Sequence, residues 1–187
     1  IVQTGGGLSV TVSDGEDVQT RSYPNSFGGD YQSRGYEFFE GMELLEHAEE
    51  TAQEGLDLLD AEQCPEGEMD IILNTNQCAL QVHESCGHPT ELDRVLGTEA
   101  SYAGTSFMTP DKLNELRYGS DKVHLTSDAT AKGGLGTFGY DDEGVKAKKV
   151  DLVKDGLFVG YQASREDAAQ VDVEVSGSMR ADGWQNL

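Results

Sequence analysis

The stretch HESCGHP at residues 83–89 decides how this chain is interpreted, because it brings two histidines and a carboxylate within six residues. Two imidazoles beside a carboxylate are what a hydrolase needs to bind zinc and activate water. The usual metalloprotease pattern places its histidines four positions apart on a helix, whereas His83 and His88 are five apart. In a regular α-helix, five positions turn the second side chain roughly 140° away from the first. The stretch therefore predicts a metal site only if the helix is broken, or widened into a π-bulge, between the histidines.

The residues around His88 provide a way to interrupt the helix. Gly87 precedes it and Pro89 follows it. Glycine adopts the unusual backbone angles of helix ends, and proline disfavours the helical conformation of the residue before it. We expect the helix to kink at Gly87 and return His88 toward His83, with Glu84 acting as general base rather than as a ligand. On spacing alone, a helix end with two partly exposed histidines explains the pattern equally well.

Three longer segments resemble the TldD/PmbA family of metallopeptidases. HESCGHPTELD at residues 83–93 resembles the family block H-E-x-x-G-H-x-x-E-x-D. GYDDEGV at 139–145 resembles its D-D-E-G turn, and VDLVKDGLFVGY at 150–161 resembles the hairpin that follows. The catalytic TldD type keeps H-E-x-x-x-H and the PmbA (TldE) type lacks it, so this chain resembles the catalytic branch.

The resemblance implies a zinc-dependent peptidase acting on peptides or unfolded chains, with His83 and His88 as metal ligands and Glu84 as the base. It also implies a homo- or heterodimer of TldD/PmbA-like subunits around an enclosed site. Family members are considerably longer, and the third zinc ligand of the catalytic branch is a cysteine near the distant carboxyl terminus. Residues 1–187 are therefore expected to be a central segment, inactive alone, that lacks an amino-terminal domain and a carboxyl-terminal β-rich portion. The alternative is a non-catalytic partner or binding subunit, against which retention of all three residues argues.

Nearby side chains are further candidates for the third ligand, because thiolates and carboxylates also bind zinc. They are Cys78, Cys86, Glu91 and Asp93. The spacing singles out none of them. A helix cysteine is more often a small buried thiol, and Glu91 can equally orient a ligating histidine. The carboxylates in the turn at 141–144 either line the cleft, support the site or form a solvated turn.

The composition restricts the function classes. The chain has 35 acidic and 13 basic residues, a net charge of -22. This balance is typical of proteins in a salt-rich cytoplasm, where screening removes self-repulsion; a docking surface for cationic peptides is the alternative. Direct nucleic-acid contact is disfavoured, because phosphate contacts need clustered Lys and Arg. No apolar run is long enough to cross a membrane, and the three cysteines predict no disulfide framework, so we expect a cytoplasmic protein.

The patterns predict an α+β fold, with a mostly antiparallel sheet, a long amphipathic helix and a motif-bearing helix packed on it. Apolar residues recur at three- and four-residue steps over 41–61, which predicts the long helix. His47 and His124 are expected to be structural histidines, half-buried in a strand in the case of His124. Strands are expected at 69–73, 122–126 and 171–175, and hairpins at 7–21 and 150–161. The segments 23–35 and 97–121 are expected to be irregular, the latter with a short helical patch near 112–116. A flexible tail is expected from 176.

Overall fold

The structure, a computed structural model, describes residues 2–180. These residues form two compact units. The first holds the chain up to Asn76 together with Gly133–Leu135, and the second holds the rest. No helix in the described part of the chain is long and apolar enough to span a membrane.

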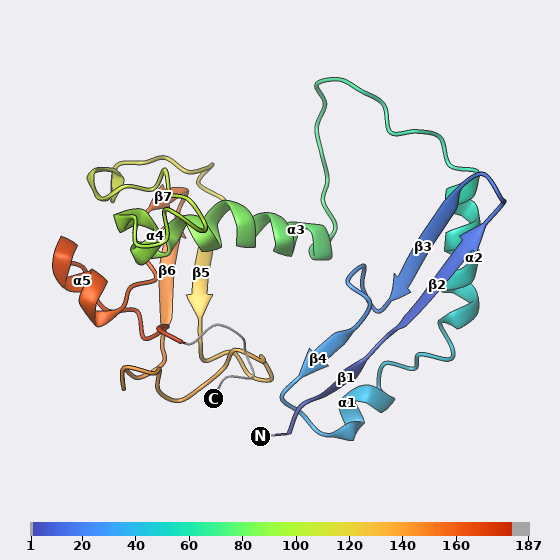
Figure 1. Ribbon diagram of the computed structural model, residues 1–187, viewed down its shortest axis with the longest axis horizontal. Helices are drawn as coiled ribbons and strands as arrows, with labels where there is room; N and C mark the ends of the chain where they lie inside the picture. Colours follow the sequence, from blue (N-terminus) through green and yellow to red (C-terminus); the bar gives the residue numbers. More distant parts are fainter. Residues whose placement is uncertain (1, 181–187) are drawn as a thin grey trace. The chain divides into compact units, whose positions relative to one another are not determined.

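In the first unit, a hairpin packs against one long helix (Figure 1). The hairpin pairs β2 (Leu8–Ser13) with β3 (Val18–Tyr23), and the helix is α2 (Ala48–Leu59). Gly55 is buried on α2, and a Cβ built there would lie 3.4 Å from Val12 of β2, so the helix packs closely on the strand at this position. The unit is completed by α1 (Tyr36–Glu40) and by the pair of β1 (Thr4–Gly6) with β4 (Asp30–Gln32).

In the second unit, several helical segments follow one another directly and a three-stranded sheet comes later in the chain (Figure 1). The segments are α3 (Thr75–Val82), the π-helical turn η1 (His83–Gly87), the 3₁₀ turn η2 (His88–Thr90) and α4 (Leu92–Leu96). The antiparallel sheet has the order β5 (Leu125–Asp128), β6 (Lys149–Lys154), β7 (Leu157–Phe158). The 3₁₀ turn η3 (Pro110–Lys112) and α5 (Arg165–Val171) complete the described elements.

Two buried clusters attach the motif segment to this sheet. Leu92 of α4 lies fully buried with Phe158 of β7 and with Tyr161, whose ring meets Phe158 edge-to-face with centroids 4.9 Å apart. Cys86 of η1 is fully buried against Val153 of β6. The wide turn and the helix after it are thus each anchored by an apolar side chain, which fixes the backbone between them.

The α+β prediction is confirmed, as are both hairpins. The sheet is divided into three small antiparallel sheets rather than one. Local bounds also differ from expectation: the long helix begins at Ala48, α1 precedes it, and β4 lies within the segment expected to be a loop. The strand expected at 122–126 is β5, shifted toward the carboxyl terminus, and the helical patch is η3 at 110–112.

The strand prediction at 69–73 is wrong. The segment is extended, but none of the strands described between residues 2 and 180 pairs with it, and Ile72 is 99% exposed. Apolar composition favours a strand only where a neighbouring backbone supplies the hydrogen-bond ladder.

The strand predicted at 171–175 is wrong. The tail expected from 176 is wrong at its start, where Ser176 is buried, and its residues 181–187 lie outside the described part of the chain. Helix α5 continues to Val171 and ends at Asp172, whose φ of 55° lies in the left-handed region. Val173 and Val175 then pack separately against the Leu92 cluster. Ser176 is buried: its amide donates to the carbonyl of Ala163 at 3.0 Å, and its hydroxyl accepts the Ala163 amide at 2.7 Å.

Candidate metal centre

The π-helical turn η1 explains how two histidines five positions apart lie on the same face of the helix. The amide of His88 donates to the carbonyl of His83, five residues back, instead of closing the four-residue bond of an α-helix. The extra residue returns both side chains to one face, so that the ring centroids lie 4.4 Å apart with planes at 74°. The helix is widened and not broken: Gly87 keeps right-handed angles, and His88 does so too although Pro89 follows it. Proline is accommodated there because it occupies the first turn of η2.

Side chains from outside the turn satisfy its carbonyl groups. Carbonyls at the end of a helical run lack donors within the helix and need other partners. The donors are the hydroxyl of Tyr118 to Ser85 at 3.0 Å, the hydroxyl of Thr90 to Cys86 at 2.8 Å and to Gly87 at 2.9 Å, and the amide of Gln162 to Gly87 at 2.9 Å. Side chains from three separate parts of the second unit therefore stabilise the wide turn.

His83, Glu84 and His88 present three metal-donor atoms that all lie within 4.8 Å of one another. A zinc ion with bonds of ~2 Å would bring the two histidine nitrogens together after small side-chain rotations, with the Glu84 carboxylate close by. Rotation is easy for His83 and Glu84, whose side chains are 59% and 61% exposed, while His88 is 32% exposed and more firmly held. No other set of three His, Cys, Asp or Glu side chains meets the same distance criterion among residues 2–180.

Glu91 fixes the ring of His88. Both of its carboxylate oxygens lie 3.0 Å from Nδ1, which leaves Nε2 as the nitrogen available to a metal. Metal-binding histidines commonly have such a partner on the second nitrogen. Arg94 in turn donates from Nε to Glu91 at 3.2 Å, and its side chain is only 16% exposed. Of the two roles open to Glu91 from the sequence, this geometry fits the orienting one.

The two nearby thiols lie outside the group of donor atoms formed by His83, Glu84 and His88. Cys86 is fully buried against β6, and burial raises the pKa of its thiol to about 11. Cys78, expected to be buried, is exposed on α3. Asp93, the remaining local candidate, is directed elsewhere: its Oδ1 accepts the amide of Arg94 at 2.8 Å.

Two carboxylates of the acidic turn at Asp141–Gly144 accept hydrogen bonds from backbone amides. The buried carboxylate of Asp141 accepts the amides of Glu143 at 3.0 Å and Val145 at 2.8 Å. The carboxylate of Glu143 accepts the amide of Arg165 at 2.8 Å, at the start of α5. Asp141 and Glu143 thus hold backbone amides in place, and Asp142 pairs with Arg180 at 3.1 Å.

The two other histidines make structural contacts. His47, in the first unit, stacks on Tyr23 with ring centroids 4.0 Å apart. His124 accepts the amide of Asp155 at 3.3 Å through Nδ1 and is exposed, rather than half-buried as expected.

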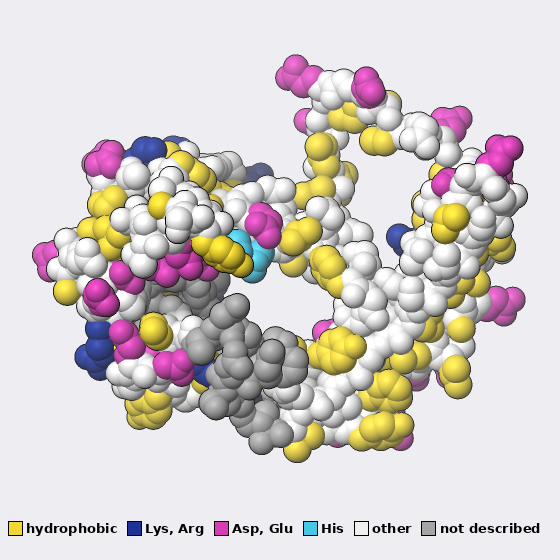
Figure 2. Space-filling model, viewed as in Figure 1, with side chains coloured by type: hydrophobic (Ala, Val, Ile, Leu, Met, Phe, Trp, Pro, Cys, Tyr) yellow, Lys and Arg dark blue, Asp and Glu magenta, His cyan; other side chains and the backbone are white. Residues whose placement is uncertain are grey.

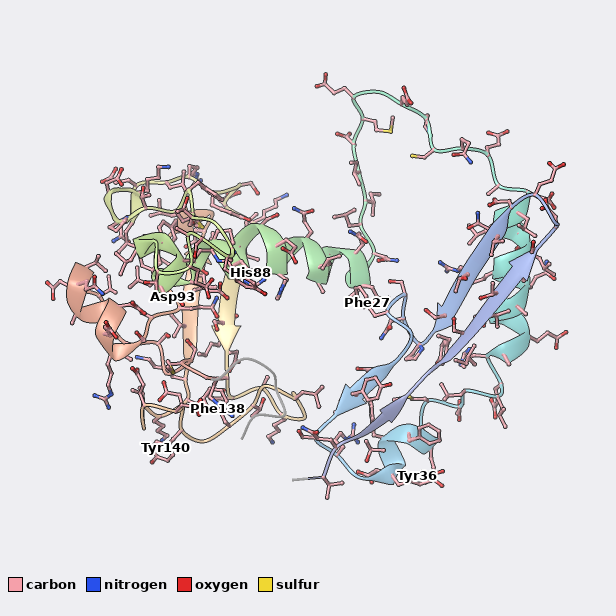
Figure 3. All side chains as sticks on the ribbon, viewed as in Figure 1. Phe27, Tyr36, His88, Asp93, Phe138 and Tyr140 are labelled. Atoms are coloured by element: carbon pink, nitrogen blue, oxygen red, sulfur yellow. The ribbon has the colours of Figure 1, made fainter. Side chains whose placement is uncertain are left out.

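A cavity of about 550 Å³ opens beside the candidate metal centre, and His88 and Glu91 form part of its wall. This volume lies within the range of small-ligand sites. Figure 3 labels His88 and Asp93, both of which line the cavity. Acidic side chains gather beside the histidines on the face of the second unit seen in Figure 2.

Several supporting residues were not found from the sequence. Thr90 and Arg94 lie four and three positions after the residues they contact, so helical spacing could have indicated them. Tyr118 and Gln162 are distant in sequence from the turn they hold. No local pattern marks such residues.

A widened helix that presents two histidines and a glutamate at the edge of a cavity defines a candidate metallohydrolase. Residues 66–186 match the family described as the PmbA/TldA metallopeptidase C-terminal domain. The chain belongs to this family.

Curated relatives share the larger part of this chain. The metalloprotease MJ0996 of Methanocaldococcus jannaschii is 38% identical over 139 residues, which cover 74% of this chain and 29% of that protein. A zinc metalloprotease TldD homolog of Saccharolobus solfataricus is 26% identical over 122 residues, covering 65% of this chain and 25% of its own length. The chain thus spans less than a third of the length of either relative.

Solved structures share the fold. A protein described as a candidate modulator of a DNA gyrase from Thermotoga maritima superposes with a TM-score of 0.70 at 18% identity, covering 96% of this chain and 38% of that one. TldE from Thermococcus kodakarensis gives a TM-score of 0.58 at 15% identity, covering 96% and 37%. At these identities the likeness concerns the fold alone.

Proposed function

We propose that the protein carrying this chain is a zinc-dependent peptidase that hydrolyses peptide bonds in peptides or unfolded chains. The observation that carries the proposal is the group of donor atoms from His83, Glu84 and His88 within 4.8 Å, with the ring of His88 held by Glu91. The relative named as a zinc metalloprotease supports the choice of metal. In this proposal residues 1–187 are the central segment of a longer protein, and a cysteine from another part of it completes the metal site.

Each residue of the group has one role. Bound zinc supplies a Lewis acid that polarises the scissile carbonyl. His83 and His88 bind the ion through ring nitrogens, and Glu91 keeps Nε2 of His88 directed toward it. Glu84 takes a proton from the attacking water and then donates it to the leaving amine. Its exposed side chain beside His83, with Oε1 3.8 Å from Nε2, can move between these two positions.

We further propose that the active protein is a cytoplasmic pair of TldD/PmbA-like subunits, either two copies or one copy with a TldE-type partner. The fold shared with a protein named TldE supports this pairing. A net charge of -22 argues against direct contact with nucleic acid, so the gyrase-modulator description of one structural neighbour is not carried over.

The decisive experiment compares the full-length protein with its Glu84→Gln variant, in high salt, for peptide hydrolysis and for zinc content. We expect the variant to retain zinc and to lose cleavage by a factor of ~10² or more. Glu115→Gln is the matched control, because Glu115 is exposed in the second unit and lies outside the donor group. It should leave both quantities unchanged.

Two outcomes would contradict the proposal: the first rejects Glu84 as the catalytic base, and the second rejects the peptidase assignment. Equal cleavage by wild type and Glu84→Gln would remove Glu84 from the mechanism. Absence of cleavage by the zinc-loaded wild type would favour the alternative of a non-catalytic partner subunit.

A further inference from the structure

The cavity beside the metal-donor group has a charge pattern that the proposed reaction does not use. Two arginines line it, and both already pair with carboxylates. Arg94 lies 3.2 Å from Glu91 and 3.4 Å from Glu99, and Arg180 lies 3.1 Å from Asp142. The basic side chains of the wall are therefore neutralised within the protein.

Two other carboxylates of the wall have no ion pair among the described residues. Asp93, in the first turn of α4, accepts the amide of Arg94 through Oδ1 at 2.8 Å. Asp167, in the first turn of α5, accepts the hydroxyl of Ser164 through Oδ2 at 2.5 Å. Each keeps its second oxygen without a hydrogen-bond partner among residues 2–180, and both side chains are partly buried. The cavity thus has negative charge that is not compensated.

Two exposed side chains of the cavity wall can contact the alkyl part of a long substrate side chain. Tyr102 and Met179 both line the cavity and are exposed to the solvent. A thioether packs readily on alkyl groups, and an aromatic face also attracts a cation. Lysine and arginine combine an apolar stem with a terminal charge, which such a surface can bind at both ends.

We propose that this cavity binds a lysine or arginine side chain of the peptide substrate next to the scissile bond. The inference rests on the proposed peptidase function and specifies its substrate class. His88 belongs to both the cavity wall and the donor group, whereas His83 and Glu84 do not line the cavity. A peptide whose side chain enters the cavity on the Glu91 side of the His88 ring would pass its backbone over that ring toward the metal.

The general acidity of the chain does not by itself explain this pattern. Carboxylates on an open surface are screened by salt within about 10 Å at 0.1 M. Carboxylates in the wall of a concave site act in a lower dielectric and attract a cation more strongly. The two groups also come from different helices, α4 and α5, which the fold brings to one cavity.

The test measures peptide binding to the full-length, zinc-loaded Glu84→Gln protein, which is expected not to cleave. Fluorescent peptides, acetylated and amidated at their ends, carry Lys, Arg, Gln, norleucine or Glu at one central position. We expect Lys and Arg peptides to bind on the order of tenfold more tightly than the norleucine peptide, and the Glu peptide to bind most weakly.

Two variants locate the effect. Adding Asp93→Asn or Asp167→Asn should each reduce the advantage of Lys over norleucine several-fold. Glu166→Gln is the matched control, because Glu166 is the exposed neighbour of Asp167 on α5 and does not line the cavity. Urea unfolding midpoints for all variants verify folding, and the two aspartates on separate helices keep the test decisive if one variant is unstable.

The outcomes separate this inference from the proposed function. Equal affinity for Lys and norleucine peptides, or a preference that neither aspartate variant changes, overturns the cationic subsite. A preference that appears only with a free amino terminus, tested with unacetylated norleucine peptides, also overturns it, because the ligand would then be the α-amine. Cleavage of the same peptides by wild type is scored separately: loss of cleavage with an intact Lys preference rejects only the peptidase, and cleavage with no preference rejects only the subsite.

Discussion

The hydroxyl of Thr90 donates to the carbonyl oxygen of Cys86 at 2.8 Å, four residues earlier, and also reaches the carbonyl of Gly87. Thr90 is fully buried, so these carbonyls depend on a side chain and not on water. The wide turn that unites His83 and His88 is therefore stabilised by a residue whose hydroxyl binds the backbone of the turn rather than either imidazole.

Thr90→Val should lower both stability and zinc affinity. Valine keeps the shape of threonine but leaves the Cys86 carbonyl without this donor, which costs ~1–3 kcal/mol of unfolding free energy. Urea unfolding and competitive zinc titration would measure the two effects. Thr105→Val is the control because Thr105 is exposed. If Thr90→Val is destabilised but binds zinc as wild type does, the turn does not depend on this hydroxyl for its geometry.

Glu91→Gln should weaken zinc binding while leaving the fold intact. The amide can still contact Nδ1 of His88, but without the negative charge that makes the imidazole a better donor. Loss of such a partner typically reduces metal affinity by ~10–100-fold. A competition titration with a chelator gives the dissociation constant, and Glu174→Gln, at an exposed position, serves as reference. An unchanged constant would mean that Glu91 serves only the ion pair with Arg94.

The three cysteines should differ sharply in reactivity. Cys64 and Cys78 are exposed, whereas Cys86 is buried and burial raises its pKa to about 11. Since the thiolate is the reactive form, a maleimide at pH 7.5 should label Cys64 and Cys78 quickly and Cys86 only upon unfolding. Peptide mapping by mass spectrometry assigns the sites. Rapid native labelling of Cys86 would show that the turn opens frequently.

The sequence was most informative where the determinants are local. The alternation along β2 and the Lys154-Asp155-Gly156 turn are contained within a few residues, and both hairpins were predicted. The sequence allowed a broken or a widened helix at His83–His88, and the kink expected at Gly87 is wrong, because Gly87 keeps right-handed angles within the widened turn. The widened form depends on Tyr118, Thr90 and Gln162 as donors to the turn. Two of these donors are far away in sequence and carry no signal of their own.

The failures share a physical cause. Met69–Leu73 and Val171–Val175 have the composition of strands, but a strand forms only where a partner strand is available. The second segment is instead divided between the end of α5 and single valines that fill the Leu92 cluster. The cavity could not be predicted at all, since Asp93 and Asp167 are brought together by the packing of α4 on α5.

Tyr161 should make stability fall at alkaline pH. Burial, together with the charge of Asp111, raises the pKa of Tyr161 from 10.0 to about 12. The folded state therefore holds this proton more tightly than the unfolded chain: stability is unaffected below pH 10 and falls between pH 10 and 12. Tyr161→Phe should remove this contribution to the alkaline loss of stability. It should also lower the unfolding free energy by about 1 kcal/mol at neutral pH, because the hydroxyl donates to the Met108 carbonyl at 2.6 Å. Urea unfolding at a series of pH values checks both effects.

The exposed Tyr140 offers the control for this series. Tyr140→Phe should follow the wild-type curve throughout. If Tyr161→Phe shows the same alkaline fall as wild type, ionisation of Tyr161 does not contribute to it.

The acidic surface should make the protein more stable as salt is added. With a net charge of -22, carboxylates repel one another across the surface. Raising KCl from about 0.1 M to about 1 M shortens the Debye length from about 10 Å to about 3 Å and suppresses this repulsion. We expect the thermal midpoint to rise steadily over this range. Glu46→Gln with Glu49→Gln, two exposed positions, should raise the midpoint at low salt and reduce the gain from KCl. A midpoint that is independent of KCl in both proteins would exclude a halophilic adaptation. The carboxylates of the cavity wall would then be the acidic residues whose proposed role, binding a cationic side chain, is still to be tested.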